Sequence, residues 1–314
     1  MSQDLRIVSL LPAATETVAA LGLSEALVGR SHECDFPPQV QSLPVCTRAL
    51  LDGDQASSAI DADVRNLVES ALSLYQVDAA ALQRLQPTHV VTQDQCDACA
   101  VSLGEVQAAL AEFTGNQPQI VTLRATTLSE VWRDIEALAG ELGVDASPTL
   151  TDLQARVDAC TQTIETLEPP DHPRVALLEW TDPLMAAGNW IPELARLAGA
   201  RPALGTPGDR SPYLSWQALY QADPEVIVVM PCGFDLSRTR QAAQSLLQQP
   251  GWLQLQAVRN NAVCIADGNA YFNRPGPRLV DSLEILAEML HPQSFDYGYQ
   301  GRAWERLSMP VAIG

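Results

Sequence analysis

The sequence predicts an α/β fold built as two α/β lobes joined by one long α-helix. Three observations support this prediction. Short apolar runs alternate with amphipathic helical patterns along the chain, one long helical pattern stands alone near the middle, and the two halves share a weak internal repeat. Such alternation implies a parallel or mixed sheet covered by helices. With 314 residues, the chain is long enough for two such lobes.

The first half, residues 1–146, contains the elements of an N-terminal lobe. Strands are expected where four or five mostly apolar residues lie between turn signals, at 7–11, 27–31, 44–47, 88–92 and 119–123. Helices are expected where apolar residues recur at steps of three and four, at 13–21, 60–75, 78–85, 102–113 and 127–143.

A linking helix is expected within residues 147–170. Ser147 is expected to cap it and Pro148 to occupy its first position. One apolar stripe runs along it through Leu150, Leu153, Val157, Cys160, Ile164 and Leu167. From 148 to 168 such a helix spans about 31 Å at 1.5 Å per residue. Two consecutive prolines, 169 and 170, end it.

The second half, residues 171–314, repeats the alternation and predicts a C-terminal lobe. Its expected strands are 174–180, 225–230 and 262–266, and its expected helices are 191–200, 213–221, 236–249 and 278–290. An Ala-Leu pair, a proline five residues later, a buried strand and a loop with cysteine occur at 81–96 and again at 218–232. This repeat places a loop at the carboxyl end of one strand in each lobe, the edge where ligands bind in open α/β sheets.

Composition excludes several functional classes. The net charge is −19, from 38 acidic and 19 basic residues, and every basic residue is arginine. Such a chain repels a phosphate backbone, so nucleic-acid binding is not expected, and without lysine neither Schiff-base catalysis nor a P-loop is possible. The start of the sequence has no basic segment followed by a long apolar run, and no stretch is apolar enough for a membrane span. We therefore expect a cytoplasmic protein, or a periplasmic one if a leader has been removed.

Cysteine and histidine suggest a metal as one possibility. Seven scattered cysteines predict free thiols in a reducing compartment. His32, Cys34, Cys46, Cys96 and Cys99 offer the ligand types preferred by Zn or an Fe–S cluster. The alternative is that these cysteines are small buried apolar residues and that His32 is a hydrogen-bonded loop residue.

No catalytic motif is present, so we expect a protein that is not an enzyme. The sequence lacks G-x-S-x-G, H-E-x-x-H and G-x-G-x-x-G. Aromatic and amide residues instead follow the strands of the second lobe: Trp180, Asn189, Trp190, Tyr213, Trp216, Asn269, Tyr271, Phe272 and Asn273. Flat rings interspersed with amides suit a large planar ligand with amide groups, whereas the alternative is ordinary core tryptophan and helix-start asparagine.

The chain resembles a known family at several points. The stretch from Arg6 to Thr17, with Leu21-Gly22, Val28-Gly29 and Phe36-Pro37, resembles the opening of vitamin B12-binding proteins. These are substrate-binding components of ABC importers, in the class with a rigid helical backbone. Residues 269–278 look like the family's second-lobe loop. The resemblance covers nearly the whole chain, and it implies two lobes on one helix with a cobalamin-like corrinoid held between them.

The resemblance also implies which residues touch the ligand. It places contacts at Pro12, Ala13, Thr47, Arg48, Trp180, Tyr271 and Phe272. From their positions after predicted strands we add His32, Glu33, Gln93, Gln95, Asn189, Trp190 and Arg274. Residues 32–35 and 93–99 look like those of a branch known only as cobalamin-binding.

The sequence departs from the importer pattern in its start and at two docking positions. Where the family has a transporter-docking Glu in each lobe, this chain has Ala80 and Gln217, and Gln93 replaces a family aromatic. We therefore expect a carrier, buffer or sensor of a corrinoid, with less support for docking to an ABC permease. Two alternatives stay open, namely a metal or Fe–S redox or sensor protein using the cysteines, and a heme or siderophore binder on the same scaffold.

Overall fold

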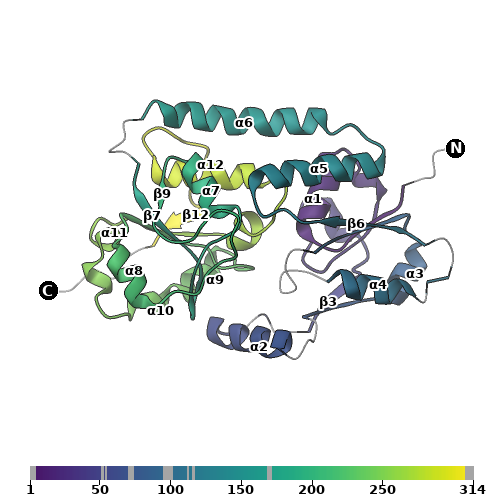
Figure 1. Ribbon diagram of the computed structural model, residues 1–314, viewed down its shortest axis with the longest axis horizontal. Coiled ribbons are helices and arrows are strands. Elements are labelled where there is room, and N and C mark those ends of the chain that lie inside the picture. The colour runs from purple at the N-terminus through teal and green to yellow at the C-terminus, as the bar shows by residue number, and fades with distance from the viewer. Residues whose placement is uncertain are drawn as a thin grey trace. The chain divides into compact units, whose positions relative to one another are not determined.

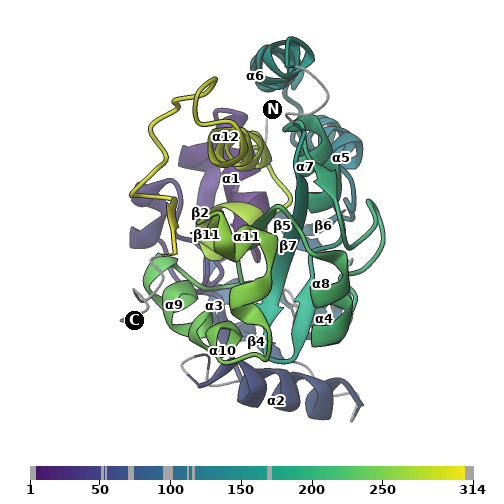
Figure 2. The ribbon, with the colours of Figure 1, turned by 90° about the vertical axis from the view of Figure 1, so that its left-hand side faces the viewer.

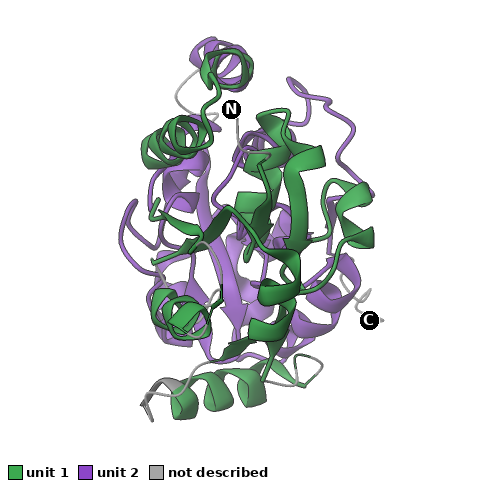
Figure 3. Cartoon of the chain, turned by 90° about the vertical axis from the view of Figure 1, so that its right-hand side faces the viewer, with its two compact units in different colours: residues 1–125, 129–152 green, residues 126–128, 153–314 purple. Residues whose placement is uncertain are grey.

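The structure is a computed structural model. It describes residues 5–50, 53, 55–69, 74–94, 102–111, 113–114, 117–167 and 172–307. The chain forms two compact units, coloured separately in Figure 3. Unit 1 comprises residues 1–125 and 129–152, and unit 2 comprises residues 126–128 and 153–314.

Unit 1 is built on a parallel sheet whose strand order is β2-β1-β5-β6. The strands are β1 (Ile7–Ser9), β2 (Leu27–Arg30), β5 (His89–Gln93) and β6 (Gln119–Leu123). After β1 the chain forms β2, which lies on one side of the β1–β5 pair, and after β5 it forms β6, which lies on the opposite side. The point between β1 and β5 is therefore a topological switch point, and its carboxyl edge is the expected ligand side.

Both faces of this sheet are covered. Ile7 and Val91 belong to one apolar cluster, whereas Val8 and Val90 belong to another, as expected for alternating side chains on a doubly covered parallel sheet. The helices of the first half, labelled in Figure 1, are α1 (Pro12–Ala20), α2 (Ser57–Glu69), α3 (Ala79–Leu85), α4 (Leu103–Ala111) and α5 (Leu128–Leu142). Two short 3-10 turns, η1 (Ser24–Ala26) and η2 (Pro38–Ser42), lie between α1 and α2.

Two expected elements of the first half were wrong in extent. A small antiparallel sheet pairs β3 (Thr47–Ala49) with β4 (Tyr75–Val77). The strand expected at 44–47 therefore begins at Thr47, and the helix expected to reach Tyr75 ends at Glu69. Ala49 pairs with Tyr75, a long-range contact that local periodicity does not reveal.

The expected linking helix is present as α6 (Ser147–Glu165), and the boundary between the two units falls inside it, after Asp152. Ser147, expected as the cap, is already the first residue of the helix, and its N–H donates to the Asp145 carboxylate at 2.9 Å. Leu153, Cys160 and Ile164 of the expected stripe are buried. In the described part of the chain, no helix combines the length and apolarity needed to cross a membrane.

Unit 2 contains a mixed sheet of order β12-β11-β10-β7-β8, with β9 also paired to β7. Its strands are β7 (Arg174–Thr181), β8 (Leu184–Ala186), β9 (Arg201–Pro202), β10 (Val226–Val229), β11 (Val263–Ala266) and β12 (Trp304–Arg306). β9, β7, β10 and β11 run parallel, whereas β8 and β12 are antiparallel to their neighbours. The α/β fold class predicted from the sequence is confirmed in both units.

Helices cover the sheet of unit 2. They are α7 (Ile191–Leu197), α8 (Trp216–Ala222), α9 (Leu236–Ala242), α10 (Gln244–Leu247), α11 (Gln256–Arg259) and α12 (Leu279–Leu290), with the 3-10 turn η4 (Trp252–Gln254) and the π-helical turn η5 (Gly268–Phe272). α7 and α12 pack together, as Figure 2 shows. The helix expected at 236–249 is divided into α9 and α10 at Ala243.

The internal sequence repeat corresponds to a repeated helix–strand unit, α3 with β5 in unit 1 and α8 with β10 in unit 2. Asp78 caps α3 and Ser215 caps α8, each by accepting a backbone N–H three residues later. Gln86 and Asp223 end these helices with left-handed φ values of 44° and 36°. In each unit the strand that follows, β5 or β10, pairs in parallel with the first strand of its sheet.

Candidate functional site

The predicted site residues of unit 1 lie mainly where its strands end. Pro12 and Ala13 open α1 just after β1, and Gln93 is the last residue of β5. His32 and Glu33 follow β2, whereas Thr47 begins β3. Gln95, Cys96 and Cys99 lie outside the described residues.

A buried cluster of hydroxyls and one thiol holds the loop after β2 against α1. The Thr15 hydroxyl is 2.8 Å from Ser9 Oγ and 3.0 Å from Cys34 Sγ. Ser31 Oγ is 3.2 Å from the same sulfur, and Cys34 is only 1% exposed. Cys34 therefore acts here as a small buried residue with polar neighbours, which matches the structural alternative for this cysteine.

Arg30 fixes the same loop from its other side. Nη1 donates to the carbonyl oxygens of Ser31 at 3.0 Å and Cys34 at 3.1 Å, and Nη2 donates to that of Gln41 at 3.1 Å. Because one rigid guanidinium binds three carbonyls, the backbone that carries His32 is held in place.

His32 has one anchored ring nitrogen. Its backbone N–H donates to Thr47 Oγ1 at 3.0 Å, and its Nδ1 lies 2.8 Å from the same oxygen. The ring centroid is 5.6 Å from that of Tyr75. Burial, with a smaller contribution from the nearby Arg30 charge, lowers the pKa of His32 below its usual value. Among the described residues Nε2 has no hydrogen-bond partner. The arrangement is a neutral imidazole with one nitrogen available to a metal.

The hairpin beside His32 presents an arginine. Arg48 is exposed, and its guanidinium donates to Gln76 Oε1 on the paired strand, with Nε at 2.8 Å. Within the described part of the chain, Nη1 of this guanidinium makes no hydrogen bond, so it is available to a ligand.

The predicted cysteine metal site stays a prediction, because two of its four cysteines, Cys96 and Cys99, lie outside the described residues. Burial raises the pKa of Cys46 to about 11. Within the described ranges there is no group of three His, Cys, Asp or Glu residues able to hold a metal ion.

In unit 2, Trp180 lies near the end of β7 and belongs to an aromatic cluster with Phe234. Its ring centroid is 5.1 Å from that of Phe234, and Arg238 Cζ lies 3.8 Å from the centre of the Phe234 ring. The Trp180 indole N–H donates to the Asp182 carbonyl at 3.1 Å. Phe234 and Arg238 were not predicted. The repeat placed a loop after the strand expected at 225–230, which is β10, and Phe234 is the first aromatic residue after that strand.

η5 places Tyr271 at the same edge of the sheet. The Asn269 N–H donates to the Phe234 carbonyl at 3.1 Å, and the Asp267 carboxylate caps the turn at the Ala270 N–H, 2.7 Å away. The Tyr271 ring lies 4.5 Å from Arg278 Cζ and, edge-on, 6.0 Å from the ring of Tyr299. Tyr271 remains half-exposed.

Three other predicted residues of unit 2 are buried. Phe272 is 0% exposed, and its carbonyl accepts the Trp190 indole N–H at 2.8 Å. Arg274 is 3% exposed. Trp180 at 9% and Phe234 at 3% exposure are buried as well, so of these rings Tyr271 has the largest area open to a ligand, and Trp180 offers no more than a small edge.

Glu179 is a residue of β7, and Asn189 follows β8; both contact the segment 209–211. Ser211 Oγ donates to the Glu179 carboxylate at 2.8 Å, and burial raises the pKa of Glu179 despite this hydrogen bond. Asn189 has a φ of 50°, and its backbone N–H donates to the Asp209 carbonyl at 2.6 Å. Asparagine tolerates this left-handed conformation, which sets the turn before α7.

Comparisons with known proteins agree on one fold and one family. The family model described as "Periplasmic binding protein" matches residues 7–270. A Bacillus subtilis (strain 168) protein named "Uncharacterized ABC transporter substrate-binding lipoprotein YvrC" is 22% identical over 92% of this chain and 81% of its own.

Solved structures are similar over nearly the full length. The apo periplasmic heme-binding protein RhuT from Roseiflexus sp. RS-1 is 22% identical, with a TM-score of 0.67 over 93% of this chain and 100% of that one. The periplasmic vitamin B12 binding protein BtuF of Vibrio cholerae is 21% identical, with a TM-score of 0.62 over 91% of this chain and 96% of that one. At these identities the likeness establishes a shared fold.

Proposed function

Because the chain belongs to the periplasmic binding protein family, we propose that it binds a metal-containing tetrapyrrole through the carboxyl edges of both sheets. A cobalamin-like corrinoid is the first candidate. The chain is a binding protein and not an enzyme. The observation that carries the ligand class is the anchored His32 imidazole, with Nδ1 at Thr47 and Nε2 without a partner among the described residues.

His32 suits a metal at the centre of a macrocycle. A neutral imidazole is a common ligand for cobalt and iron, and a hydrogen bond at the other ring nitrogen orients it. Its lowered pKa keeps the imidazole neutral at pH 7. Pro12, Ala13, Glu33, Thr47, Arg48, Gln93 and Gln95 would form the surroundings of the ligand on unit 1.

Unit 2 would contribute flat apolar contacts. The half-exposed Tyr271 ring would be the main contact, and the buried Trp180 would add its small exposed edge. Phe234 packs beside Trp180 with an angle of 51° between the ring planes, and its carbonyl accepts the Asn269 N–H. Asn189 would contribute an amide, whereas Trp190, Phe272 and Arg274 would act as the buried support of these contacts.

Charge at this edge favours a corrinoid over heme. A corrinoid carries neutral amide side chains, whereas heme carries two carboxylates. Arg278 already lies 3.5 Å from Asp281, and both Arg274 and Arg278 are close enough to Asp267 to lower its pKa against the larger effect of burial. Because these arginines already face carboxylates, neutral amides fit this edge better. Heme is the second candidate, because His32 could ligate iron and similar structures include heme-binding proteins.

Absorbance titration of the full chain tests the ligand class. Hydroxocobalamin, hemin and ferrioxamine B are each added to the protein at neutral pH. We expect hydroxocobalamin to bind one-to-one with a shifted visible spectrum, and His32→Ala to abolish the shift. His89→Ala is the matched control, because His89 also has a pKa lowered by burial but lies at the start of β5.

The outcomes separate the candidates. One-to-one binding of hemin without binding of hydroxocobalamin would overturn the corrinoid assignment but would support a tetrapyrrole as the ligand class. Binding of ferrioxamine alone, or no spectral change with any ligand at large excess, would overturn both. Stoichiometric Zn or Fe in protein purified without chelator, together with no ligand binding, would favour the cysteine site.

We further propose a carrier, buffer or sensor role in the cytoplasm. Ala80 and Gln217, which stand at the family's docking positions, are exposed near the starts of α3 and α8. Neither can form the ion pair of a docking glutamate. Fractionation of the native host with an antibody tests the location, and recovery of the protein from the periplasm would overturn this part of the proposal.

A further inference from the structure

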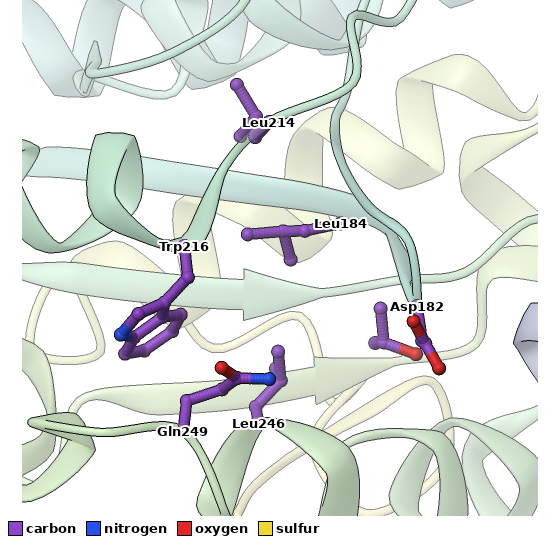
Figure 4. Close-up of a pocket in the computed structure, with 7 residues that line it drawn as sticks. Asp182, Leu184, Leu214, Trp216, Leu246 and Gln249 are labelled. Carbon is purple, nitrogen blue, oxygen red and sulfur yellow. The ribbon is translucent and has the colours of Figure 1, made fainter.

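Unit 2 has a small hollow beside the turn between β7 and β8. It has a volume of about 140 Å³ and is shown in Figure 4. The residues that matter in its lining are Asp182, Leu184, Leu214, Trp216, Leu246 and Gln249. A cavity of roughly 150 Å³ admits one benzene ring, so this hollow can admit one side chain but not a tetrapyrrole.

The rim carries polar groups that are not in use. Within the described residues, the Asp182 carboxylate makes no hydrogen bond or ion pair, and the Gln249 side-chain amide makes no hydrogen bond. The Trp216 indole N–H donates to the Pro250 carbonyl at 2.7 Å, so this residue offers its ring and not its N–H. A carboxylate, an amide and an aromatic ring thus surround an apolar floor of leucines.

Segments next in sequence to the lining residues carry exposed aromatic and aliphatic side chains. Tyr213 is 54% exposed, Tyr220 42% and Leu253 66%. Trp216 and Tyr220 are four residues apart on α8 and therefore share one face of the helix. Tyrosine and tryptophan are enriched in protein interfaces, so the exposed Tyr213 and Tyr220 together with Trp216 favour this part of unit 2 as a docking surface.

We propose that this hollow receives an arginine side chain from a protein partner. The aliphatic stem would pack on the leucines, while the guanidinium would meet the Asp182 carboxylate, the Gln249 oxygen and the Trp216 ring. Charge complementarity supports a basic partner, because this chain has a net charge of −19. None of these residues belongs to the proposed tetrapyrrole contacts, so the docking surface does not depend on the proposed function.

Peptide binding to the full chain tests this surface. The probe is the capped pentapeptide Ala-Leu-Arg-Leu-Ala, observed through the tryptophan indole signals in NMR, with Trp216 assigned from Trp216→Phe. We expect the Trp216 signal to move and Asp182→Asn to weaken binding by about fivefold, the upper range for an exposed ion pair. Asp158→Asn is the matched control, because it removes an exposed carboxylate of unit 2 on α6 and should change binding less than about twofold.

Further probes separate specific docking from general attraction. Replacing the arginine of the peptide by neutral, isosteric citrulline should weaken binding about as much as Asp182→Asn. An equal loss in Asp158→Asn, an unmoved Trp216 signal, or equal binding of the citrulline peptide would overturn the proposal. Free arginine binding as tightly as the peptide would also overturn it, in favour of a small-molecule site. Asp182→Asn should keep the melting temperature and the hydroxocobalamin spectrum of the parent protein, which makes this test independent of the tetrapyrrole.

Discussion

Glu288 on α12 should hold the C-terminal segment of unit 2 in place. One carboxylate oxygen accepts the backbone N–H groups of Tyr297 at 2.7 Å and Tyr299 at 3.2 Å. The other accepts the Gln300 N–H at 2.7 Å and the Trp304 indole N–H at 2.8 Å. Glu288 is 4% exposed. The substitution Glu288→Gln keeps the shape but turns one acceptor into a donor that faces two N–H groups.

The size of the effect follows from these four bonds. A hydrogen bond to a charged group contributes about 1.5–3 kcal/mol, and Glu288→Gln loses two of them. We use the lower value because Gln300 is exposed and Tyr297 half-exposed, so that water can replace part of each loss. The segment should therefore be destabilised by about 3 kcal/mol, which corresponds to roughly a hundredfold in an opening equilibrium.

Amide hydrogen exchange reports on this opening directly. Protection of the Tyr297, Tyr299 and Gln300 amides should fall roughly a hundredfold in Glu288→Gln. Glu305→Gln is the control, since Glu305 pairs with the half-exposed Arg240 and should cost less than about 1 kcal/mol. A loss below about tenfold in Glu288→Gln, or an equal loss in the control, would refute this reasoning.

Three further predictions concern the stability of the candidate site and its scaffold. The raised pKa of Glu179 means that its carboxyl group holds a proton more tightly in the folded state than in the unfolded state. Protonated Glu179 therefore contributes to the free energy of unfolding at low pH, and this contribution is lost as the pH rises from about 4.3, the usual pKa of glutamate, through the higher pKa of the folded state. Glu179→Gln cannot ionise and can keep the Ser211 hydrogen bond, so its melting temperature should exceed that of the parent at pH 8 and match it at pH 4; equal values at both would contradict the assignment. Gly268→Ala would place a Cβ 2.2 Å from the Pro231 carbonyl oxygen, so we expect a loss of about 1–3 kcal/mol in chemical denaturation and weaker hydroxocobalamin binding. A Cβ added at Gly140 on α5 would have no atom within 4 Å, so Gly140→Ala should raise the free energy of unfolding by about 0.5–1 kcal/mol in the same assay. A lower free energy of unfolding in this variant would contradict a helical Gly140.

The elements that local pattern could predict were those with strong periodicity. β6 has the expected bounds 119–123, and α12 differs from its expected bounds by one residue at its start. The short strands β8, β9 and β12 were not predicted, because each has only two or three residues and is defined by its pairing with β7 or β11. Such edge strands depend on long-range contacts, which periodicity does not contain.

For the site, sequence alone determined the α/β class, the long helix and the loops at strand ends, because repeating apolar patterns and the positions of proline and glycine fix these features locally. Only the tertiary structure decided which rings at those ends are exposed. Tyr271 is half-exposed, whereas its neighbour Phe272 is fully buried and Trp190 donates its indole N–H to the Phe272 carbonyl. The same holds for His32, whose ring is oriented through Nδ1 by Thr47, fifteen residues away. Whether a side chain faces a ligand or the core depends on what packs over it, and those contacts come from distant parts of the chain.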